Sequence, residues 1–497
     1  MLPELITFVS RLFVLLAIAP AAGSTGMERS TLRDVQTATG GRAQASDPAA
    51  VAFDRVTTDS RTARPGDLFW ALEGSRHDGH DFVADAIGRG AVACVVQENK
   101  TVAGNFPAIV VPDVLQGLQD FARSHRQRMD ALVIGVTGSV GKTTTREMLH
   151  AAISSTCEGC RSRKNFNNHI GLPLSVLDIE RRHEFAVLEM AASHSGEIRQ
   201  LADVARPEVG VLTGIGVAHL ASFGSIETIA ATKTELLESL PSGGFAVING
   251  DDPRCRAAGV RARCRVIAAG ERADNVLRAT AIESDGQALR FRVDGTAYTL
   301  RAIGRHHVST ALAAIAVAKE VGIKPRDIAD GLVQFAAVEG RCQMRQRQPW
   351  TLIDDTYNAN PSSAEAACRL LSDCKCEGRR ILVLADMLEL GPESAAWHTA
   401  IGELAARLGI DGLIAVGQYA ADVLAGARGQ GMHSEQLAQC DDLDVVTAIL
   451  DCWLAPGDVV LVKGSRSMRM ERVVDRLMAL TNIQENIAPC ASTRACA

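Results

Sequence analysis

Short apolar runs alternate with helix-like stretches along most of the 497-residue chain. In the first part, the runs at residues 67–72, 91–96 and 108–111 are separated by helical patterns and Gly/Pro turns, which is typical of a small α/β unit. A polar stretch at residues 123–131 then interrupts the pattern. We therefore predict a first domain over residues 27–129.

Continuous apolar runs bounded by polar residues or glycine mark the next block, at residues 185–190, 209–213 and 245–249. Such runs indicate strands buried on both faces, and hence a mostly parallel sheet with crossover helices. The alanine-rich stretch 308–322, which ends at glycine, predicts one of these helices. We expect the second domain over residues 130–338.

The last block again alternates strand-like runs with helical segments. Its apolar runs lie at residues 351–355, 380–386, 412–417 and 458–465. This pattern favours a doubly wound, Rossmann-like domain over residues 339–481. Residues 482–497 carry no periodic pattern and predict a loose tail. The predicted fold class is α/β, with a small first domain, a central domain with a mostly parallel sheet and a C-terminal Rossmann-like domain.

The composition is that of a multidomain globular protein. Apolar residues make up 47% and charged residues 22%, which argues against wholesale disorder and against a polytopic membrane protein. A formal net charge of -6 argues against broad nucleic-acid binding, which needs a basic face. We expect no nucleic-acid partner and no stable membrane insertion.

The thirteen cysteines are scattered rather than set at the close spacings of a disulfide framework. Cys157 and Cys160 form a CxxC pair, and Cys374 and Cys376 form a CxC pair. Neither has a second pair at zinc-finger distance. We interpret the cysteines as reduced, mostly buried thiols rather than as a metal or redox site.

The N-terminal segment 11–23 resembles a short signal-peptide core. It is short for a membrane span, and Glu4 with only one basic residue before the apolar run argues against export. We therefore predict that Met27 is the true start, that residues 1–26 are a misassigned extension, and that the protein is cytoplasmic.

A glycine-rich turn, G-S-V-G-K-T at residues 138–143, lies between an apolar run and a helix-like pattern. Glycines let backbone N–H groups turn toward phosphate oxygens, and the helix N-terminus adds its positive dipole end. Lys142 would reach the β- and γ-phosphates, and Thr143 would offer a hydroxyl to Mg²⁺. The strict P-loop spacing is missed by one position, because Val136 stands where the first glycine belongs. An ordinary βα turn is the alternative.

Three more side chains suit a metal-dependent phosphate site. Glu189 ends an apolar strand, where a carboxylate beside the phosphates could hold a metal ion. His219 follows another strand, and Lys233 lies on a predicted helix. Taken singly, a solvent-exposed carboxylate, a satisfied histidine and a surface lysine would explain each of them.

Ordered motifs along residues 31–480 carry a family resemblance. They include TTDSRTARPGDLFWALEGSRHDGHDF, GVTGSVGKTTTREM, KNFNNHIGLPLSVL, LEMAASHSGEI, AHLASFGSIETIAATKTELL, INGDDP, GRHHVSTALAA, EGRCQ, DDTYNANPSS, LADMLELG and VKGSRSMRMERVV. The chain resembles the Mur ligases, ATP-dependent amino-acid ligases of peptidoglycan precursor synthesis. The NFNN.IGLPL, DDTYNANP and DMLELG motifs point to the branch that joins D-alanyl-D-alanine to UDP-N-acetylmuramoyl-tripeptide.

The resemblance implies a UDP-substrate domain, a central ATPase domain, and a C-terminal domain that closes with ATP and the incoming amine. Such an enzyme uses ATP and Mg²⁺ to convert the tripeptide carboxylate into an acyl phosphate, which the dipeptide amine attacks. The UDP-linked pentapeptide, ADP and phosphate would be released. Diaminopimelate and lysine both stay open as the third residue of the tripeptide, and a monomer is expected.

The resemblance also implies roles for single residues. Those expected around ATP are Thr137, Gly138, Ser139, Val140, Gly141, Lys142, Thr143, Asn249, Asp252, Arg341 and Asp355. Those expected at the UDP-linked substrate or the dipeptide are Ser60, Arg61, Asp78, His80, Asn165, Asn167, Asn168, Tyr357, Asn358, Asn360, Lys463 and Arg466. The implied metal ligands are Thr143, Glu189, His219 and Lys233, the last one carbamoylated. Lys142, Glu189, His219 and Lys233 are the implied catalytic residues.

Four positions depart from the family pattern. His307 and Thr310 stand where the family usually has asparagines, so the resemblance does not carry adenine contacts over to this segment. Ala191 and Ala385 replace glycines, which affects backbone freedom rather than chemistry.

Rival activities differ in their motifs. The ligase that adds the third amino acid usually has D-N-P-R in its C-terminal domain, whereas the similar DDPR at residues 251–254 lies in the central block. Folylpolyglutamate synthase is a second relative. A regulatory or motor P-loop ATPase and an inactive scaffold are alternatives of another class, against which Glu189, His219 and Lys233 argue together.

Overall fold

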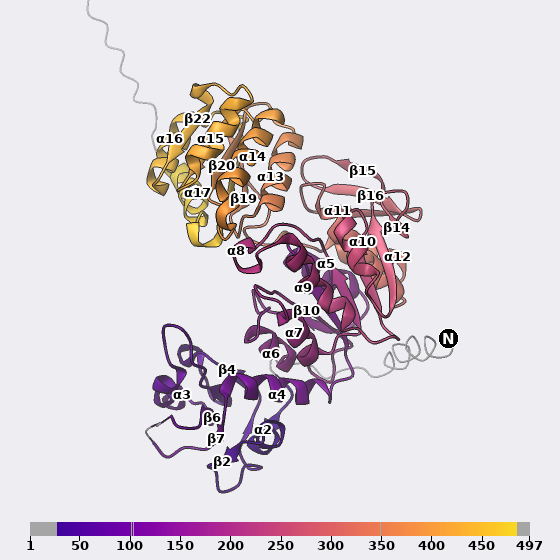
Figure 1. Ribbon diagram of the computed structural model, residues 1–497, viewed down its shortest axis with the longest axis vertical. Coiled ribbons are helices and arrows are strands. Elements are labelled where there is room, and N and C mark those ends of the chain that lie inside the picture. The colour runs from indigo at the N-terminus through magenta and orange to yellow at the C-terminus, as the bar shows by residue number, and fades with distance from the viewer. Residues whose placement is uncertain (1–26, 101, 103, 348, 485–497) are drawn as a thin grey trace, which may run out of the picture.

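The computed structural model describes residues 27–100, 102, 104–347 and 349–484. Three parts follow one another along the long axis of the molecule, with the N-terminal and C-terminal parts at opposite ends (Figure 1). The predicted extension 1–26, including its apolar run, lies outside the described residues. Helix α17 (Glu471–Gln484) continues past residue 482, where the sequence predicts a loose tail.

A five-stranded sheet forms the N-terminal part, in the order β2-β7-β6-β5-β4. Its strands are β2 (Arg42–Ala43), β4 (Arg55–Thr57), β5 (Asp67–Trp70), β6 (Ala93–Gln97) and β7 (Ala108–Val111), and a short pair joins β1 (Ser30–Thr31) to β3 (Ala52–Phe53). The helices are α2 (Leu32–Thr39), α3 (Val83–Gly88) and α4 (Val114–Arg126). The buried indole N–H of Trp70 donates to the carbonyl oxygen of Val114 at 2.7 Å, which fixes the start of α4 against the sheet.

A seven-stranded parallel sheet forms the central part, in the order β14-β13-β12-β11-β8-β10-β9. Its strands are β8 (Leu132–Thr137), β9 (Gly159–Arg161), β10 (Phe185–Glu189), β11 (Val209–Leu212), β12 (Phe245–Asn249), β13 (Arg265–Gly270) and β14 (Leu277–Arg278). Alternate residues pack on opposite faces: Val133 joins one core and Ile134 the other. The predicted mostly parallel sheet is confirmed.

Helices cover both faces of this sheet. They are α5 (Lys142–Ile153), α6 (Gly171–Leu177), α7 (Glu197–Ala205), α8 (Leu220–Phe223), α9 (Ile226–Glu238), α10 (Pro253–Gly259), α11 (His307–Glu320) and α12 (Pro325–Val333). The predicted alanine-rich helix is α11, which packs against α5. Strand β8 lies between β10 and β11, where the chain crosses from one half of the sheet to the other. Such a switch point is where open α/β sheets form ligand sites.

A small antiparallel sheet is inserted before α11, and no sequence pattern singled it out. It contains β15 (Thr280–Ser284), β16 (Leu289–Val293) and β17 (Thr296–Leu300). In β16 the buried residues Leu289, Phe291 and Val293 alternate with exposed arginines. This half-buried alternation differs from the continuous apolar runs of the parallel strands.

A six-stranded sheet forms the C-terminal part, in the order β18-β19-β23-β20-β21-β22, and only β18 runs antiparallel to its neighbour. Its strands are β18 (Gln343–Arg347), β19 (Trp350–Asp355), β20 (Arg380–Ala385), β21 (Gly412–Val416), β22 (Leu437–Cys440) and β23 (Val459–Lys463). Helices α13 (Pro361–Asp373), α14 (Ser394–Arg407), α15 (Ala420–Gly429), α16 (Leu443–Trp453) and α17 cover it. The predicted α/β class with several domains is confirmed.

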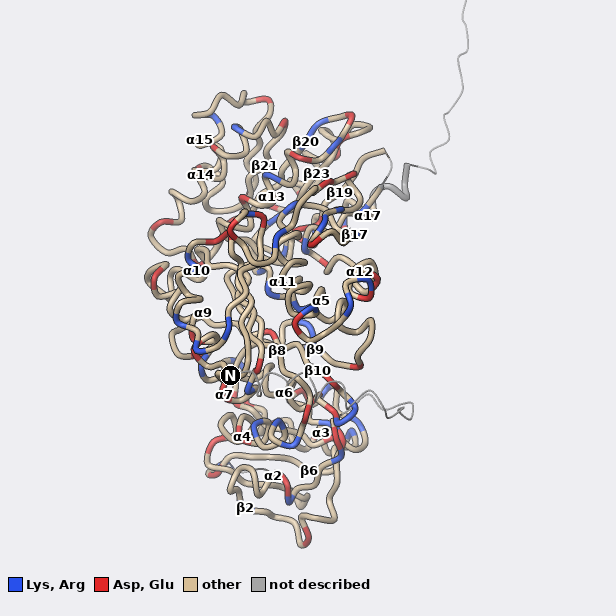
Figure 2. The backbone as a smooth tube through the Cα atoms, turned by 90° about the vertical axis from the view of Figure 1, so that its right-hand side faces the viewer, with Lys and Arg blue, Asp and Glu red and all other residues tan. Residues whose placement is uncertain are grey.

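Charged residues of both signs are mixed in all three parts rather than gathered on one face (Figure 2). No helix among the described residues is both long and apolar enough to cross a membrane. The described cysteines carry free thiols, and most of them are buried or half-buried.

Candidate active site

A cavity of 1120 Å³ lies between the central and C-terminal parts. The predicted residues that line it are Ser139, Val140, Gly141, Lys142, Thr143, Asn165, Asn167, Asn168, Glu189, His219, Asn249, Asp252, Arg341, Asp355, Tyr357, Asn358, Asn360, Lys463 and Arg466. These residues come from chain segments up to 327 positions apart, counted from Ser139 to Arg466. One site therefore needs both parts of the molecule.

The glycine-rich turn joins β8 to α5 on the cavity wall. A Cβ on Gly138, at φ 150°, would lie 2.1 Å from Thr213 Oγ1, so this position has no room for a side chain. Gly141 is the N-cap of α5, has φ 80° and brings no side-chain cap to the helix. The first backbone N–H groups of α5 are thus available to an anion.

Lys142 is the first residue of α5, and its Nζ donates to the carbonyl oxygen of Gly138 at 2.7 Å. Burial lowers the pKa of this amine from its usual value. This hydrogen bond holds the amine directly over the turn, where it can contact a phosphate oxygen.

The loop after β11 supports the glycine-rich turn through hydrogen bonds. Ser139 Oγ donates to the carbonyl oxygen of Gly216 at 2.7 Å. The carboxylate of Asp252 accepts from the backbone N–H of Ile215 at 2.8 Å, and Asn249 donates to the carbonyl oxygen of Thr213 at 3.3 Å. Asn249 and Asp252 thus hold the loop that supports the glycine-rich turn. Thr137, which does not line the cavity, is fully buried beneath it and donates to Met190.

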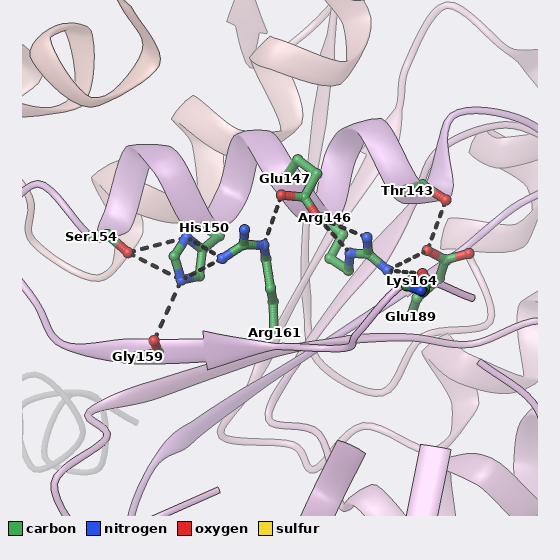
Figure 3. A network of polar contacts seen from close by, with 9 residues as sticks. All are labelled: Thr143, Arg146, Glu147, His150, Ser154, Gly159, Arg161, Lys164 and Glu189. Carbon is green, nitrogen blue, oxygen red and sulfur yellow. Dashed lines mark hydrogen bonds and ion pairs between the residues drawn. The ribbon is translucent and has the colours of Figure 1, made fainter. Parts of the chain in front are cut away.

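Glu189 is buried, which excludes the simple explanation of a strand-end carboxylate in solvent. Its carboxylate accepts from Thr143 Oγ1 at 2.9 Å and from Arg146 at 3.2 Å (Figure 3). It also accepts from Asn167 Nδ2 at 2.8 Å. A hydroxyl and a carboxylate from two elements thus meet at the mouth of the turn. Oxygen ligands of this kind suit Mg²⁺.

Arg146 is a site residue that sequence reasoning missed, although it lies in the quoted GKTTTREM motif. It lies one helical turn after Thr143, so both side chains reach the same carboxylate. The buried guanidinium also donates to the carbonyl oxygen of Lys164 at 2.6 Å and to Glu147 at 2.7 Å (Figure 3). Arg146 therefore fastens α5 to the segment that leads to Asn167.

Lys233 is 3% exposed, which excludes the alternative of a surface lysine. It lies outside the cavity lining, on α9, where its Nζ donates to the carbonyl oxygen of Ala192 at 3.4 Å and lies 5.7 Å from the ring centre of Phe223. Burial, and then the charge of Lys142, lowers the pKa of Lys233 to about 7. Much of this amine is therefore neutral at physiological pH.

His219 contacts the C-terminal part. Its Nδ1 pairs with the carboxylate of Glu389, and the backbone N–H of Ala221 donates to the carbonyl oxygen of Glu389 at 3.0 Å. Both His219 and Glu389 have positive φ values, 53° and 64°. Glu389 is the second site residue that sequence reasoning missed, because nothing local shows that the LADMLELG loop meets α8.

The C-terminal wall of the cavity is basic. Lys463 is 1% exposed, and its Nζ donates to Asp355 at 2.6 Å and to the carbonyl oxygen of Asn358 at 3.0 Å. The guanidinium of Arg341 lies 4.1 Å from the ring centre of Tyr357, and that of Arg466 lies 5.7 Å from it. This wall faces the glycine-rich turn with cations that suit an anionic ligand.

Four predicted residues, Ser60, Arg61, Asp78 and His80, lie in the N-terminal part and do not line the cavity. Lys100, and to a smaller extent His80, lowers the pKa of Asp78 from its usual value. His80 Nε2 accepts from the backbone N–H of Gln97 at 2.9 Å. His80 also pairs with Asp78, whereas Arg61 pairs with Asp59.

Comparison with known proteins places this arrangement in a family. Three family models match the chain: the Mur ligase family catalytic domain at residues 53–126, the Mur ligase middle domain at 136–318, and the Mur ligase glutamate ligase domain at 340–466. UDP-N-acetylmuramoyl-tripeptide--D-alanyl-D-alanine ligase of Bacillus subtilis (strain 168) is 34% identical over 427 residues, covering 85% of this chain and 93% of that protein. The chain belongs to the Mur ligase family. The predicted family is confirmed.

Solved structures of Mur ligases support the same assignment. MurF from Acinetobacter baumannii superimposes with a TM-score of 0.83 at 32% identity, covering 91% of this chain and 100% of that one. MurF from Thermotoga maritima, solved in complex with ADP, gives a TM-score of 0.76 at 29% identity, covering 86% and 98%. The match thus extends over all three parts of this Mur ligase.

Proposed function

We propose that this Mur ligase joins D-alanyl-D-alanine to UDP-N-acetylmuramoyl-tripeptide with cleavage of ATP to ADP and phosphate, forming the UDP-linked pentapeptide precursor of peptidoglycan. One observation carries the proposal: a single cavity brings the glycine-rich turn of the central part opposite Lys463, Arg466 and Tyr357 of the C-terminal part. Phosphoryl transfer and amine attack both need access to the same carboxylate. A cavity with a phosphate site on one wall and a second binding wall opposite meets that need.

ATP binds with its phosphates at the turn. The free N–H groups at the start of α5 and the amine of Lys142 surround the position of the β- and γ-phosphates. Arg341 approaches from the segment before β18, and its buried Nε has no hydrogen-bond partner among the described residues. Lys142 and Arg341 hold the negative charge that develops during phosphoryl transfer.

Thr143 and Glu189 would hold Mg²⁺, and His219 and a carbamoylated Lys233 would be the further protein ligands. The hydroxyl of Thr143 and the carboxylate of Glu189 already lie 2.9 Å apart, a donor set that fits a hard cation. When bound, the ion neutralises charge on the phosphate oxygens. Arg146 holds the Glu189 carboxylate in place, and His219 would have to leave its contact with Glu389 to act as a ligand.

Carbamoylation of Lys233 is supported by its buried, partly neutral amine. The amine nitrogen attacks the carbon of CO₂, one proton leaves to water, and the lysine becomes an anionic carbamate. This change replaces a buried, partly protonated amine beside Lys142 with a carboxylate-like group. Burial, and then the charge of Lys142, lowers the pKa of Lys233, and an anionic carbamate turns the second effect into attraction.

The tripeptide carboxylate then takes the γ-phosphoryl group of ATP and becomes an acyl phosphate. The free amine of D-alanyl-D-alanine attacks the acyl carbon, phosphate leaves, and an amide bond is formed. The asparagines at 165, 167 and 168 orient the tripeptide end, and the wall that contains Asn358, Asn360, Lys463 and Arg466 receives the dipeptide. Closure of the two parts keeps water from the acyl phosphate.

The N-terminal part, residues 27–129, binds the UDP group through Ser60, Arg61, Asp78 and His80. Residues 130–338 bind ATP, and residues 339–481 bind the dipeptide. We place the enzyme in the cytoplasm as a monomer.

The test is phosphate release by the full chain with ATP and Mg²⁺, with the tripeptide substrate present and the dipeptide added or omitted. Steady release must need both substrates, and the pentapeptide must appear by mass. Lys142→Ala must lose at least about 1000-fold in rate while the circular dichroism spectrum stays unchanged. Release that ignores the dipeptide, or ligation by a folded Lys142→Ala variant, would overturn the proposal.

A further inference from the structure

A group of side chains of the kinds that ligate metals lies on the cavity wall at the start of α11, one helical turn before Thr310, which borders Gly141 of the glycine-rich turn. His306 and His307 stand at the start of α11, and Cys342 lies just before β18. Their ligand atoms all lie within 4.8 Å of one another, and Cys342 Sγ is 3.7 Å from His306 Nε2. The two imidazole ring centres are 4.2 Å apart. This spacing is close to that between neighbouring ligands of one tetrahedral metal ion, roughly 3.3–3.8 Å for Zn–N and Zn–S bonds.

The group is buried but not sealed. His307 is 5% exposed and Cys342 is 7% exposed, yet all three side chains line the cavity, so an ion in solution can reach them. Nδ1 of His307 is buried without a hydrogen-bond partner among the described residues. An unpartnered buried nitrogen is costly, and a metal ion would satisfy it.

Charged groups of both signs lie around the three side chains. The groups that face Cys342 are the carboxylate of Asp355, which accepts from its backbone N–H at 3.2 Å, and the amine of Lys463, which pairs with Asp355. Asp355 offsets the charge of Lys463, and the guanidinium of Arg341, the residue before Cys342, adds one positive charge near the thiol.

We propose that His306, His307 and Cys342 bind one soft divalent cation such as Zn²⁺, with a fourth position open to the cavity. On binding, the thiol of Cys342 loses its proton to water and the thiolate forms the metal–sulfur bond. The ligand set of two nitrogens and one sulfur separates this site from the oxygen-rich Mg²⁺ site at Thr143 and Glu189.

The three ligands come from both sides of the connection between the central and C-terminal parts, so a bound ion would link these parts. His306 and His307 belong to the helix of the central part, whereas Cys342 lies on the segment that leads into the C-terminal sheet. A metal bound to all three joins the two parts at their connection. It therefore restrains the opening and closing that ligation needs, and Zn²⁺ acts as an inhibitor.

The binding test uses the full reduced chain titrated with Co²⁺ as a spectroscopic substitute for Zn²⁺. One equivalent is expected to produce a thiolate-to-cobalt charge-transfer band that Zn²⁺ removes. Cys342→Ala should abolish the band, and His307→Asn should weaken the affinity at least tenfold. Cys368→Ala, which removes another buried free thiol, is the matched control and should change neither. A band that is absent, or that persists unchanged in folded Cys342→Ala or His307→Asn, overturns the proposal.

The inhibition test rests on the proposed function. Zn²⁺ at saturating Mg²⁺ should slow pentapeptide formation at least fivefold, and a zinc-selective chelator should restore it. In Cys342→Ala the same Zn²⁺ should change the rate less than twofold, whereas Cys368→Ala should be inhibited like the parent chain. Equal inhibition of both variants contradicts the site. The Co²⁺ band does not depend on the substrates. If the proposed function fails, the Co²⁺ titration therefore still tests the metal site.

Discussion

Arg146 is the clearest case of a single residue whose role depends on burial. Its side chain is 4% exposed, and it pairs with Glu189, which is 3% exposed. Removing one partner of a buried pair leaves the other charge without compensation, whereas exposed pairs are worth little. The value of this arginine therefore lies in holding the Glu189 carboxylate where Thr143 and Asn167 meet it.

We expect Arg146→Gln to lower the free energy of unfolding of the central part by about 3 kcal/mol. The matched control is Arg369→Gln, which breaks the exposed Arg369–Glu365 pair and should cost less than about 1 kcal/mol. Urea unfolding followed by far-ultraviolet circular dichroism measures both. Equal costs for the two variants would show that the Glu189 pair contributes no special stability.

The lowered pKa of Lys233 determines the direction in which the free energy of unfolding changes with pH. Its pKa is about 7 in the folded chain and 10.5 in the unfolded chain, so between these values the unfolded state binds more protons. Without CO₂, stability should therefore rise with pH from 7 toward 10, by about 1.4 kcal/mol per pH unit at most.

This increment should vanish in Lys233→Met and persist in Lys375→Met, which removes an exposed lysine. Urea unfolding at several pH values in bicarbonate-free buffer provides the comparison. With ¹³C-labelled bicarbonate, a carbamate carbon signal should appear in the parent chain and in Lys375→Met, and be missing from Lys233→Met. A carbamate signal that survives in Lys233→Met would assign the modification to another amine.

At the scale of elements, the parallel strands and α11 could be predicted because continuous apolar runs and alanine-rich stretches are local signals. The glycine-rich turn could be predicted for the same reason, since its motif fits in residues 138–143. Strands β15 to β17 were not predicted, because buried and exposed residues alternate in them and form no continuous apolar run. The contact of His219 with Glu389 could not be predicted, because it depends on how two segments 170 positions apart meet in space.

The glycine-rich turn yields a prediction of its own. In Gly138→Ala the added Cβ would meet Thr213 Oγ1 at 2.1 Å and the backbone of Gly214 at 3.0 Å, so the turn must shift away from the phosphates. The KM for ATP should rise at least about tenfold, or about 1.4 kcal/mol. Gly429→Ala, in a helix where an added Cβ meets nothing within 4 Å, should leave this KM unchanged. An unchanged KM for ATP in Gly138→Ala would show that the turn does not bind the phosphates.

At the scale of the whole molecule, the site exists only where two parts meet. The central part supplies Lys142, Thr143 and Glu189, and the C-terminal part supplies Lys463 and Arg466. The order of the three blocks is visible in the sequence, but their mutual placement is not, because the apolar pattern does not tell which elements share a core: one hydrophobic cluster joins Trp70 of the N-terminal sheet to Val133 of the central sheet. The function depends on that placement, since the carboxylate must meet a phosphoryl donor and an amine in turn.

The most direct test of this account follows the oxygen atoms of the carboxylate. UDP-N-acetylmuramoyl-tripeptide labelled with ¹⁸O in its terminal carboxylate is incubated with the full chain, ATP, Mg²⁺ and D-alanyl-D-alanine. Acyl-phosphate chemistry predicts one ¹⁸O in each phosphate released and the other in the new amide, both detected by mass spectrometry. Phosphate without ¹⁸O, alongside pentapeptide formation, would contradict transfer of the phosphoryl group to the carboxylate.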